Sequence, residues 1–181
     1  MNARKAEAGS RLKRRRFLLF ATVGALVFAL LAPESALARP LYRPDVFVRG
    51  DVGVKVYDSS GAGQIKVVKI HRGRGKTLYY WNRNMGSSTD SYTYWGCSGV
   101  DPFGVKWLDW QEADVTAEVV AGTYDPGPPA LEPGWSSGML HLRVKVQSSA
   151  AVGEHLTCLV LATSQGDGAK DAAGYRIRVI A

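Results

Sequence analysis

Catalytic and metal-binding residue types are scarce in this sequence, whose 181 residues include two cysteines and three histidines. It contains no Gly-x-Ser-x-Gly, His-Glu-x-x-His or glycine-rich phosphate-binding motif. A zinc site uses four ligands with closely spaced pairs, and only His155 lies near either cysteine. We therefore predict no catalytic residue, no metal and no cofactor. An enzyme whose Ser/His/Asp triad is dispersed along the chain stays as the least favoured alternative.

A long hydrophobic run is also missing. The longest, from Phe17 to Ala32, would form a helix of about 24 Å at about 1.5 Å per residue, short of the ~30 Å core of a bilayer. Arginines precede this run and Ser-Ala-Leu-Ala follows it at 35–38, which is the order of a secretory signal peptide. We predict a signal peptide at 1–38, cleaved after Ala38, with the small residues Ala36 and Ala38 at the positions that signal peptidase reads. An uncleaved signal retained as a membrane anchor is the alternative.

The basic stretch ahead of this run bears on the export route. Arg14 and Arg15, followed by Arg-Phe-Leu at 16–18, fit the core of a twin-arginine (Tat) signal, which exports folded proteins. General Sec signals are also basic at this position, so both routes stay open. Either route predicts a secreted or cell-envelope protein.

Little net charge is left once the signal is removed. The whole chain carries +7, whereas residues 39–181 carry +2, because 1–38 holds seven of the 23 Lys and Arg but only two of the 16 Asp and Glu. A surface that tracks nucleic acid needs clustered Lys and Arg. We therefore expect no nucleic-acid partner, and contact with a membrane only through an uncleaved signal. Residues 39–181 are of single-domain length.

No apolar period of 3.6 residues is sustained over three turns after Pro44. Instead, short β-branched and aromatic runs alternate with clusters of Gly, Pro, Asp, Asn and Ser. In 140–146 the apolar residues share one face, and His141, Arg143 and Lys145 share the other. This pattern predicts an all-β, immunoglobulin-like two-sheet sandwich, with an eight-stranded barrel as the runner-up. The predicted strands are 45–49, 55–57, 64–70, 77–82, 91–97, 105–110, 115–121, 139–147, 155–163 and 175–180.

Both cysteines, Cys97 and Cys158, lie in the predicted exported part, where an even number favours a disulfide. A bridge that closes about 60 residues would stabilise the fold by roughly 4 kcal/mol. Alternation places Cys158 on the inward face of its strand, which favours a bridge between the two sheets. We also expect Tyr92 and Tyr94 to face inward, with Cys97 turned inward from a loop after their strand.

Several short segments recur in the order and spacing of a known module: Pro44-Asp45, Ser60–Gln64, Asn82–Asn84, Asp90–Tyr92, Gly96-Cys97, Gly104–Trp107, Asp114–Thr116, Leu131–Gly134, Thr157-Cys158, Ala162–Ser164 and Asp171-Ala172. On these segments residues 39–181 resemble an immunoglobulin-like module of secreted and cell-surface proteins of actinobacteria and other bacteria. The resemblance implies a β-sandwich of adhesive, spacer or accessory character, with no catalytic motif to transfer. Some such modules carry a cysteine pair similar to this one. The density of aromatic residues from Tyr79 to Trp110 departs from the module.

These aromatic side chains are too many to be buried on one face of the predicted sheets. Exposed aromatic rings stack on sugar rings or anchor a protein partner. We name Tyr80, Trp95, Trp107 and Trp110 as candidate ligand-binding residues. The alternative is packing, in which Trp81 or Trp107 fills the core against the disulfide.

Two further clusters have both a functional and a structural interpretation. His141 and His155 would share an outward face if their strands formed a hairpin, and could then hold copper or zinc weakly. Ordinary solvent-facing histidines are the favoured interpretation. The basic turn at 71–76 would attract an acidic polymer or lipid headgroups, or would only keep the turn solvated.

The sequence thus predicts a secreted or cell-envelope, non-enzymatic immunoglobulin-like module that serves interaction or structure. Its expected partner is an unknown protein or a cell-wall glycan. A glycan-binding module that uses the exposed aromatics is the alternative, and an envelope enzyme comes third.

Overall fold

The computed structural model describes residues 40–48, 59–127, 129–136 and 140–181. The predicted signal peptide with Arg14, Arg15, Ala36 and Ala38, and the strand predicted at 55–57, lie outside the described residues. Among the helical residues that the structure describes, none belongs to a helix long and apolar enough to cross a membrane.

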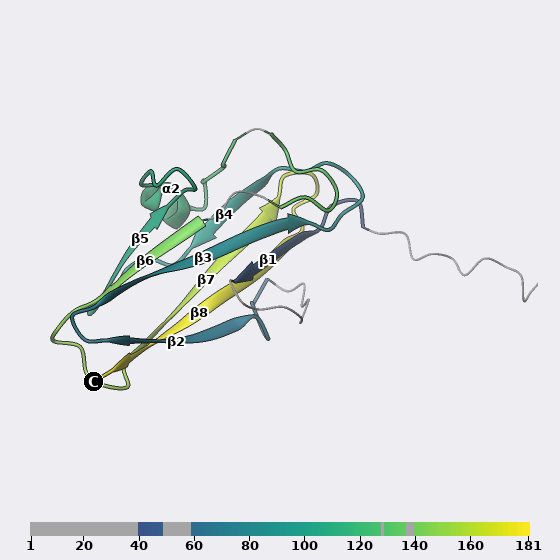
Figure 1. The fold of residues 1–181 in the computed structure, drawn as a ribbon. Coiled ribbons are helices and arrows are strands. Elements are labelled where there is room, and N and C mark those ends of the chain that lie inside the picture. The colour runs from purple at the N-terminus through teal and green to yellow at the C-terminus, as the bar shows by residue number, and fades with distance from the viewer. Residues whose placement is uncertain (1–39, 49–58, 128, 137–139) are drawn as a thin grey trace, which may run out of the picture. The chain divides into compact units, whose positions relative to one another are not determined.

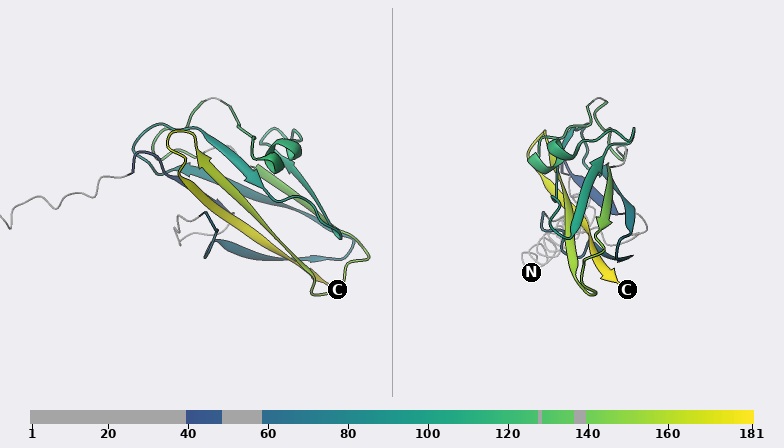
Figure 2. Two further views of the ribbon diagram at one scale, coloured as in Figure 1. Left: turned by 180° about the vertical axis from the view of Figure 1, so that it is seen from behind. Right: turned by 90° about the vertical axis from the view of Figure 1, so that its left-hand side faces the viewer.

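Two four-stranded sheets pack face to face and form a β-sandwich (Figure 1). Figure 2 shows the same two layers from two further directions. The first sheet has the order β1-β3-β6-β5, and the second has the order β2-β8-β7-β4. The strands are β1 (Pro44–Val48), β2 (Ile65–His71), β3 (Gly75–Asn84), β4 (Tyr92–Gly96), β5 (Phe103–Leu108), β6 (Leu140–Val146), β7 (His155–Ser164) and β8 (Lys170–Ile180).

All neighbouring strands are antiparallel except β2 and β8, which run parallel. In immunoglobulin order, β1, β3, β6 and β5 take the places of strands A, B, E and D, and β4, β7 and β8 take those of C, F and G. The predicted all-β, immunoglobulin-like sandwich is therefore confirmed.

Period-two alternation explains how the strands bury one face. Leu142, Val144 and Val146 of β6 are at most 2% exposed, while Arg143 and Lys145 between them are exposed. Tyr92 and Tyr94 face inward, as the alternation predicts, at 2% and 4% exposure. Such side chains from both sheets form one hydrophobic core.

The strand predicted at 115–121 is wrong. This segment forms the short helix α2 (Thr116–Ala121), which starts where Asp114 Oδ1 accepts a hydrogen bond from the Thr116 backbone N–H at 3.1 Å. It ends at Gly122, whose φ of 76° is the left-handed conformation that glycine adopts readily. Only Val119 of the helix is buried. Tertiary packing of this one side chain outweighs the local β-propensity of its valines.

The hairpin considered for the strands of His141 and His155 does not form. Their strands, β6 and β7, lie in different sheets, so the two imidazoles do not share a face. Among the described residues, no cluster of three or more His, Cys, Asp or Glu side chains could hold a metal ion.

The predicted disulfide is present, but its place differs from the prediction. Cys97 and Cys158 are bridged, with their Cα atoms 5.2 Å apart. Cys97 directly follows β4, and Cys158 lies in β7, which pairs with β4 in the same sheet. The bridge therefore joins neighbouring strands of one sheet and does not connect the two sheets.

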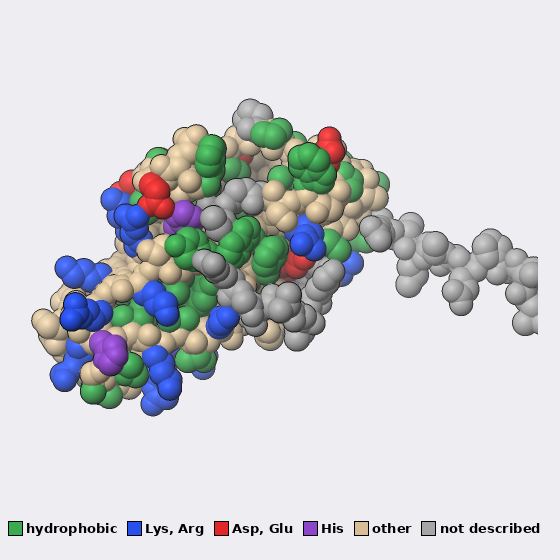
Figure 3. Space-filling view, viewed as in Figure 1, with side chains coloured by type: hydrophobic (Ala, Val, Ile, Leu, Met, Phe, Trp, Pro, Cys, Tyr) green, Lys and Arg blue, Asp and Glu red, His purple; other side chains and the backbone are tan. Residues whose placement is uncertain are grey.

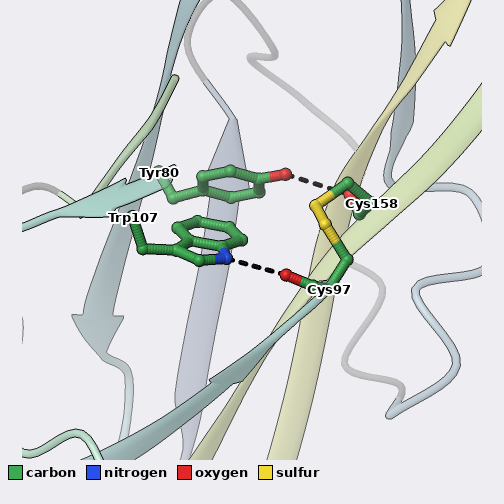
Figure 4. The surroundings of a disulfide bond; sticks show 4 residues. All are labelled: Tyr80, Cys97, Trp107 and Cys158. Carbon is green, nitrogen blue, oxygen red and sulfur yellow. Dashed lines mark hydrogen bonds between the residues drawn. A yellow bond between two sulfur atoms is a disulfide. The ribbon is translucent and has the colours of Figure 1, made fainter. Parts of the chain in front are cut away.

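Two aromatic side chains of the other sheet reach the bridge across the core (Figure 4). Trp107 Nε1 of β5 donates to the Cys97 carbonyl at 2.9 Å, and Tyr80 Oη of β3 donates to the Cys158 carbonyl at 3.0 Å. The rings of Tyr80 and Trp107 also pack together, with centroids 5.5 Å apart. Noncovalent contacts thus connect the sheets at the point where a covalent bridge was predicted.

Candidate functional site

A groove of about 440 Å³ lies at one end of the sandwich. It is bounded by the start of β4, the turn after β5, and the segment that follows α2. Its volume is in the range of small-ligand sites. The lining residues are Asp90, Ser91, Tyr92, Tyr94, Trp110, Asp125, Pro126, Gly127, Pro129, Ala130, Leu131, Glu132, Trp135 and Ser136.

Asn84, the fully buried last residue of β3, holds one wall of this groove in place. Its side-chain Nδ2 donates to the Leu131 carbonyl at 2.8 Å, and its backbone N–H donates to the Trp135 carbonyl at 2.9 Å. Asp90 and Leu131 exchange two backbone hydrogen bonds, of 3.0 and 2.7 Å. The segment after α2 is therefore fastened to the sandwich by main-chain and amide hydrogen bonds, which give the groove a defined shape.

The two most exposed tryptophans of the described residues, Trp110 at 60% and Trp135 at 63%, both line the groove. Trp110 sits in the tight turn after β5, where Asp109 Oδ1 accepts two backbone hydrogen bonds. Trp135 closes another tight turn, in which its N–H donates to the Glu132 carbonyl at 2.9 Å. Exposed indoles on ordered turns are pre-positioned for stacking because little backbone freedom is lost when a ligand binds.

The charged side chains among the described groove-lining residues are carboxylates. Asp90 is 4% exposed, and its Oδ1 accepts hydrogen bonds from the N–H groups of Ser91 and Gly166. Asp125 accepts from the Gly127 N–H at 2.8 Å and from Gln165 Nε2 at 2.9 Å. Glu132 is exposed.

Two tyrosines with raised pKa values lie in or beside this groove. Burial, and then the nearby charge of Asp90, raise the pKa of Tyr92 well above its usual value. Burial, followed by the charges of Asp109 and other neighbours, raises the pKa of Tyr124 to about 12. Both hydroxyls therefore stay neutral hydrogen-bond donors at physiological pH.

The structure separates the four aromatic candidates. Trp110 lies in the groove, whereas Trp95 is 45% exposed on the outer face of β4 and packs beside Gly122. Tyr80 and Trp107 are at most 1% exposed, so the hypothesis that these two contact a ligand is corrected: they fill the core against the disulfide.

Asp90, Glu132 and Trp135 are among the groove residues that sequence reasoning missed. They lie in loops, where strand alternation makes no prediction. A usable signal is the Pro-Gly-Trp sequence at 133–135, because a tryptophan in a tight turn has no strand face on which to be buried.

The remaining charged clusters lie away from the groove. Arg72 and Arg74 of the basic turn are exposed, and Lys and Arg side chains gather at the end of the domain that holds the C-terminus (Figure 3). His155 is exposed as expected, but the expectation that His141 faces solvent is wrong: His141 is 6% exposed, because Glu112 covers it and contacts both its Nδ1, at 2.7 Å, and the Arg143 guanidinium. Neither cluster forms part of the groove.

No protein-family model matches this chain, and no curated protein matches it. Solved structures are similar to it at low identity. A family 123 glycoside hydrolase from Clostridium perfringens is 9% identical over 65% of this chain and 23% of that chain, with a TM-score of 0.41. A FixG-related protein from Vibrio parahaemolyticus is 11% identical over 78% of this chain and 98% of that chain, with a TM-score of 0.39. The major pilin subunit of Bacillus cereus is 11% identical over 77% of this chain and 40% of that chain, with a TM-score of 0.37.

The chain thus spans about a quarter of the hydrolase and less than half of the pilin subunit. Likeness at this distance carries no argument about ligand or activity.

Proposed function

We propose that residues 39–181 form a non-catalytic extracellular interaction module that binds a saccharide in the groove at the start of β4. The observation that carries this proposal is the position of Trp110 and Trp135, which are the most exposed tryptophans described and line one cavity. Isolated exposed aromatics are unremarkable in soluble proteins, whereas two that share a concave site suggest a ligand with flat apolar faces.

A saccharide fits this groove better than a flat protein interface does. Its ring faces are apolar and stack on indoles, and its hydroxyls donate hydrogen bonds to exposed carboxylate oxygens such as those of Glu132. A protein partner would be expected to cover a broad surface around the tryptophans. The concave shape and the small volume of the groove favour a ring-sized ligand.

The disulfide supports an extracellular or cell-envelope location, because such bonds persist in oxidising compartments. Export through a signal peptide at 1–38, by the Sec or the Tat route, remains part of the proposal, as does membership of the bacterial cell-surface modules that this chain resembles. Intact mass of the protein recovered from its native host tests the export: the chain is expected to begin at Arg39. A chain that still begins at residue 1 would contradict cleavage.

Calorimetric titration of residues 39–181 with a panel of cell-wall and storage oligosaccharides tests binding. Trp110→Ala and Trp135→Ala should each weaken binding by about tenfold or more, because each removes one stacking face. Trp95→Ala is the matched control, since it removes an exposed tryptophan that does not line the groove. Binding that survives both groove variants, or that Trp95→Ala weakens equally, would overturn the proposal.

The same samples test for catalysis. If the module is not an enzyme, the oligosaccharides recovered after long incubation with the protein keep their mass. Mass spectra that show shortened or modified products, dependent on His71, His141 or His155, would establish the enzyme alternative instead.

A further inference from the structure

The groove has one sign of charge, although residues 39–181 carry a small net positive charge. Of the groove-lining residues that the structure describes, Asp90, Asp125 and Glu132 are the charged ones, and no Lys, Arg or His is among them. Clustered carboxylates in a cavity with apolar walls focus a negative potential on whatever binds there. A ligand that bears carboxylate, sulfate or phosphate groups would be repelled.

Asp90 and Tyr92, two neighbouring residues of the groove lining, are 4% and 2% exposed. Asp90 Oδ2 and Tyr92 Oη are closed to solvent, and burial, then the charge and the side-chain hydrogen bond of Asp90, raise the pKa of Tyr92. Asp90 therefore contributes its negative charge to the groove and does not offer a free acceptor.

The acceptors of the groove differ in how far they are already used. Both carboxylate oxygens of Asp125 accept hydrogen bonds, from the Gly127 N–H and from Gln165 Nε2. Glu132 makes no side-chain hydrogen bond or ion pair with the part of the chain that the structure describes, and it is exposed at the groove. Glu132 is therefore the carboxylate of the described groove lining that a ligand can use as an acceptor.

We infer that the saccharide bound in this groove carries protonated amino groups, as an unacetylated amino sugar does. This inference rests on the proposed saccharide binding. An ammonium group has three hydrogen-bond donors and no acceptor, which matches a site whose charged groups are all acceptors. It also gains from the faces of Trp110 and Trp135, because a cation is attracted to the quadrupole of an indole ring. A neutral acetylated sugar would keep the stacking and lose both charge terms.

Two oligosaccharides of equal length provide the test: β-1,4-linked glucosamine, whose amines are protonated, and its fully N-acetylated counterpart, which is neutral. Both are titrated into residues 39–181 at about pH 5.5, where Asp and Glu, with usual pKa values near 4, are ionised. The glucosamine oligomer should bind about tenfold more tightly. Added salt should reduce that advantage, because it screens the charge attraction and leaves stacking in place.

Glu132→Gln separates charge from shape. It should weaken binding of the glucosamine oligomer by about three- to fivefold, as expected for one partly exposed ion pair, and leave binding of the N-acetylated oligomer unchanged. Glu154→Gln is the matched control, with the same change of group and charge just before β7, at the end of that strand opposite the groove. It should affect neither oligomer.

The outcomes distinguish the inference from the proposal on which it rests. Equal affinity for the two oligomers, with both lost in Trp110→Ala, would overturn the charge inference and leave saccharide binding intact. Preference for the N-acetylated oligomer would also overturn it. Absence of binding to either oligomer would overturn the inference, and saccharide binding as a whole would fail only if the wider panel gave no ligand.

Discussion

Removal of the disulfide separates the covalent from the noncovalent contributions to this core. The variant replaces both Cys97 and Cys158 with alanine. The bridge spans a sequence separation of 61, so its loss frees the unfolded chain and is expected to lower the free energy of unfolding by roughly 4 kcal/mol. The hydrogen bonds from Trp107 and Tyr80 end on main-chain carbonyls, which alanine retains. The variant should therefore be less stable but keep the native core.

Urea unfolding followed by tryptophan fluorescence measures the loss of stability, with the oxidised parent at the same pH and salt as the reference. Near-ultraviolet circular dichroism reports whether the core aromatics keep their asymmetric surroundings. A loss below about 1 kcal/mol would refute the loop-closure reasoning. A near-ultraviolet signal that disappears before the unfolding transition would refute the view that the two carbonyl hydrogen bonds hold the sheets together without the bridge.

Three further predictions concern single residues. Tyr80→Phe should lower the free energy of unfolding by about 1–2 kcal/mol, because the buried Cys158 carbonyl loses its hydroxyl donor; an unchanged urea midpoint would contradict this. Gly96→Ala should lower the free energy of unfolding by about 1–3 kcal/mol, because the added Cβ would lie 2.8 Å from Cγ1 of Val119. An unchanged thermal midpoint would argue against so close a contact. Hydrogen bonds from Thr116, and then from Lys106, lower the pKa of Asp114 from 3.8 to about 2. The ionised carboxylate therefore stabilises the folded state above about pH 3.8, and this contribution is lost as the pH falls through about 2. A carbon-13 NMR titration should show that midpoint, and Thr116→Ala should raise it.

The groove illustrates how far function can be predicted from this sequence. The aromatic excess indicated that some rings must be exposed, and Trp110 is one of them. Trp135, Asp90 and Glu132 come from loops that alternation does not describe. They meet because Asn84 at the end of β3 donates hydrogen bonds to the carbonyls of Leu131 and Trp135 and so holds residues 131–135 against the sandwich. The local sequence does not encode that long-range contact.

Local periodicity determined what belongs to a single strand. The alternation in 140–146 and 155–163 predicted those strands and their inward residues, and the same parity placed Tyr92 and Tyr94 in the core. The turn residues between the runs marked most of the strand boundaries to within a few residues. An all-β sandwich follows from these patterns because each strand has one apolar face to bury.

Neighbour relations were decided by the tertiary structure alone. Parity showed that Cys158 points inward, but it could not show that β7 pairs with β4, which places the bridge within one sheet. The segment predicted as a strand at 115–121 is a helix whose one buried side chain, Val119, packs into the core beside Gly96 at the end of β4. Pairing and packing join residues far apart in the chain, whereas a periodic pattern reports only which way each side chain points from its own backbone.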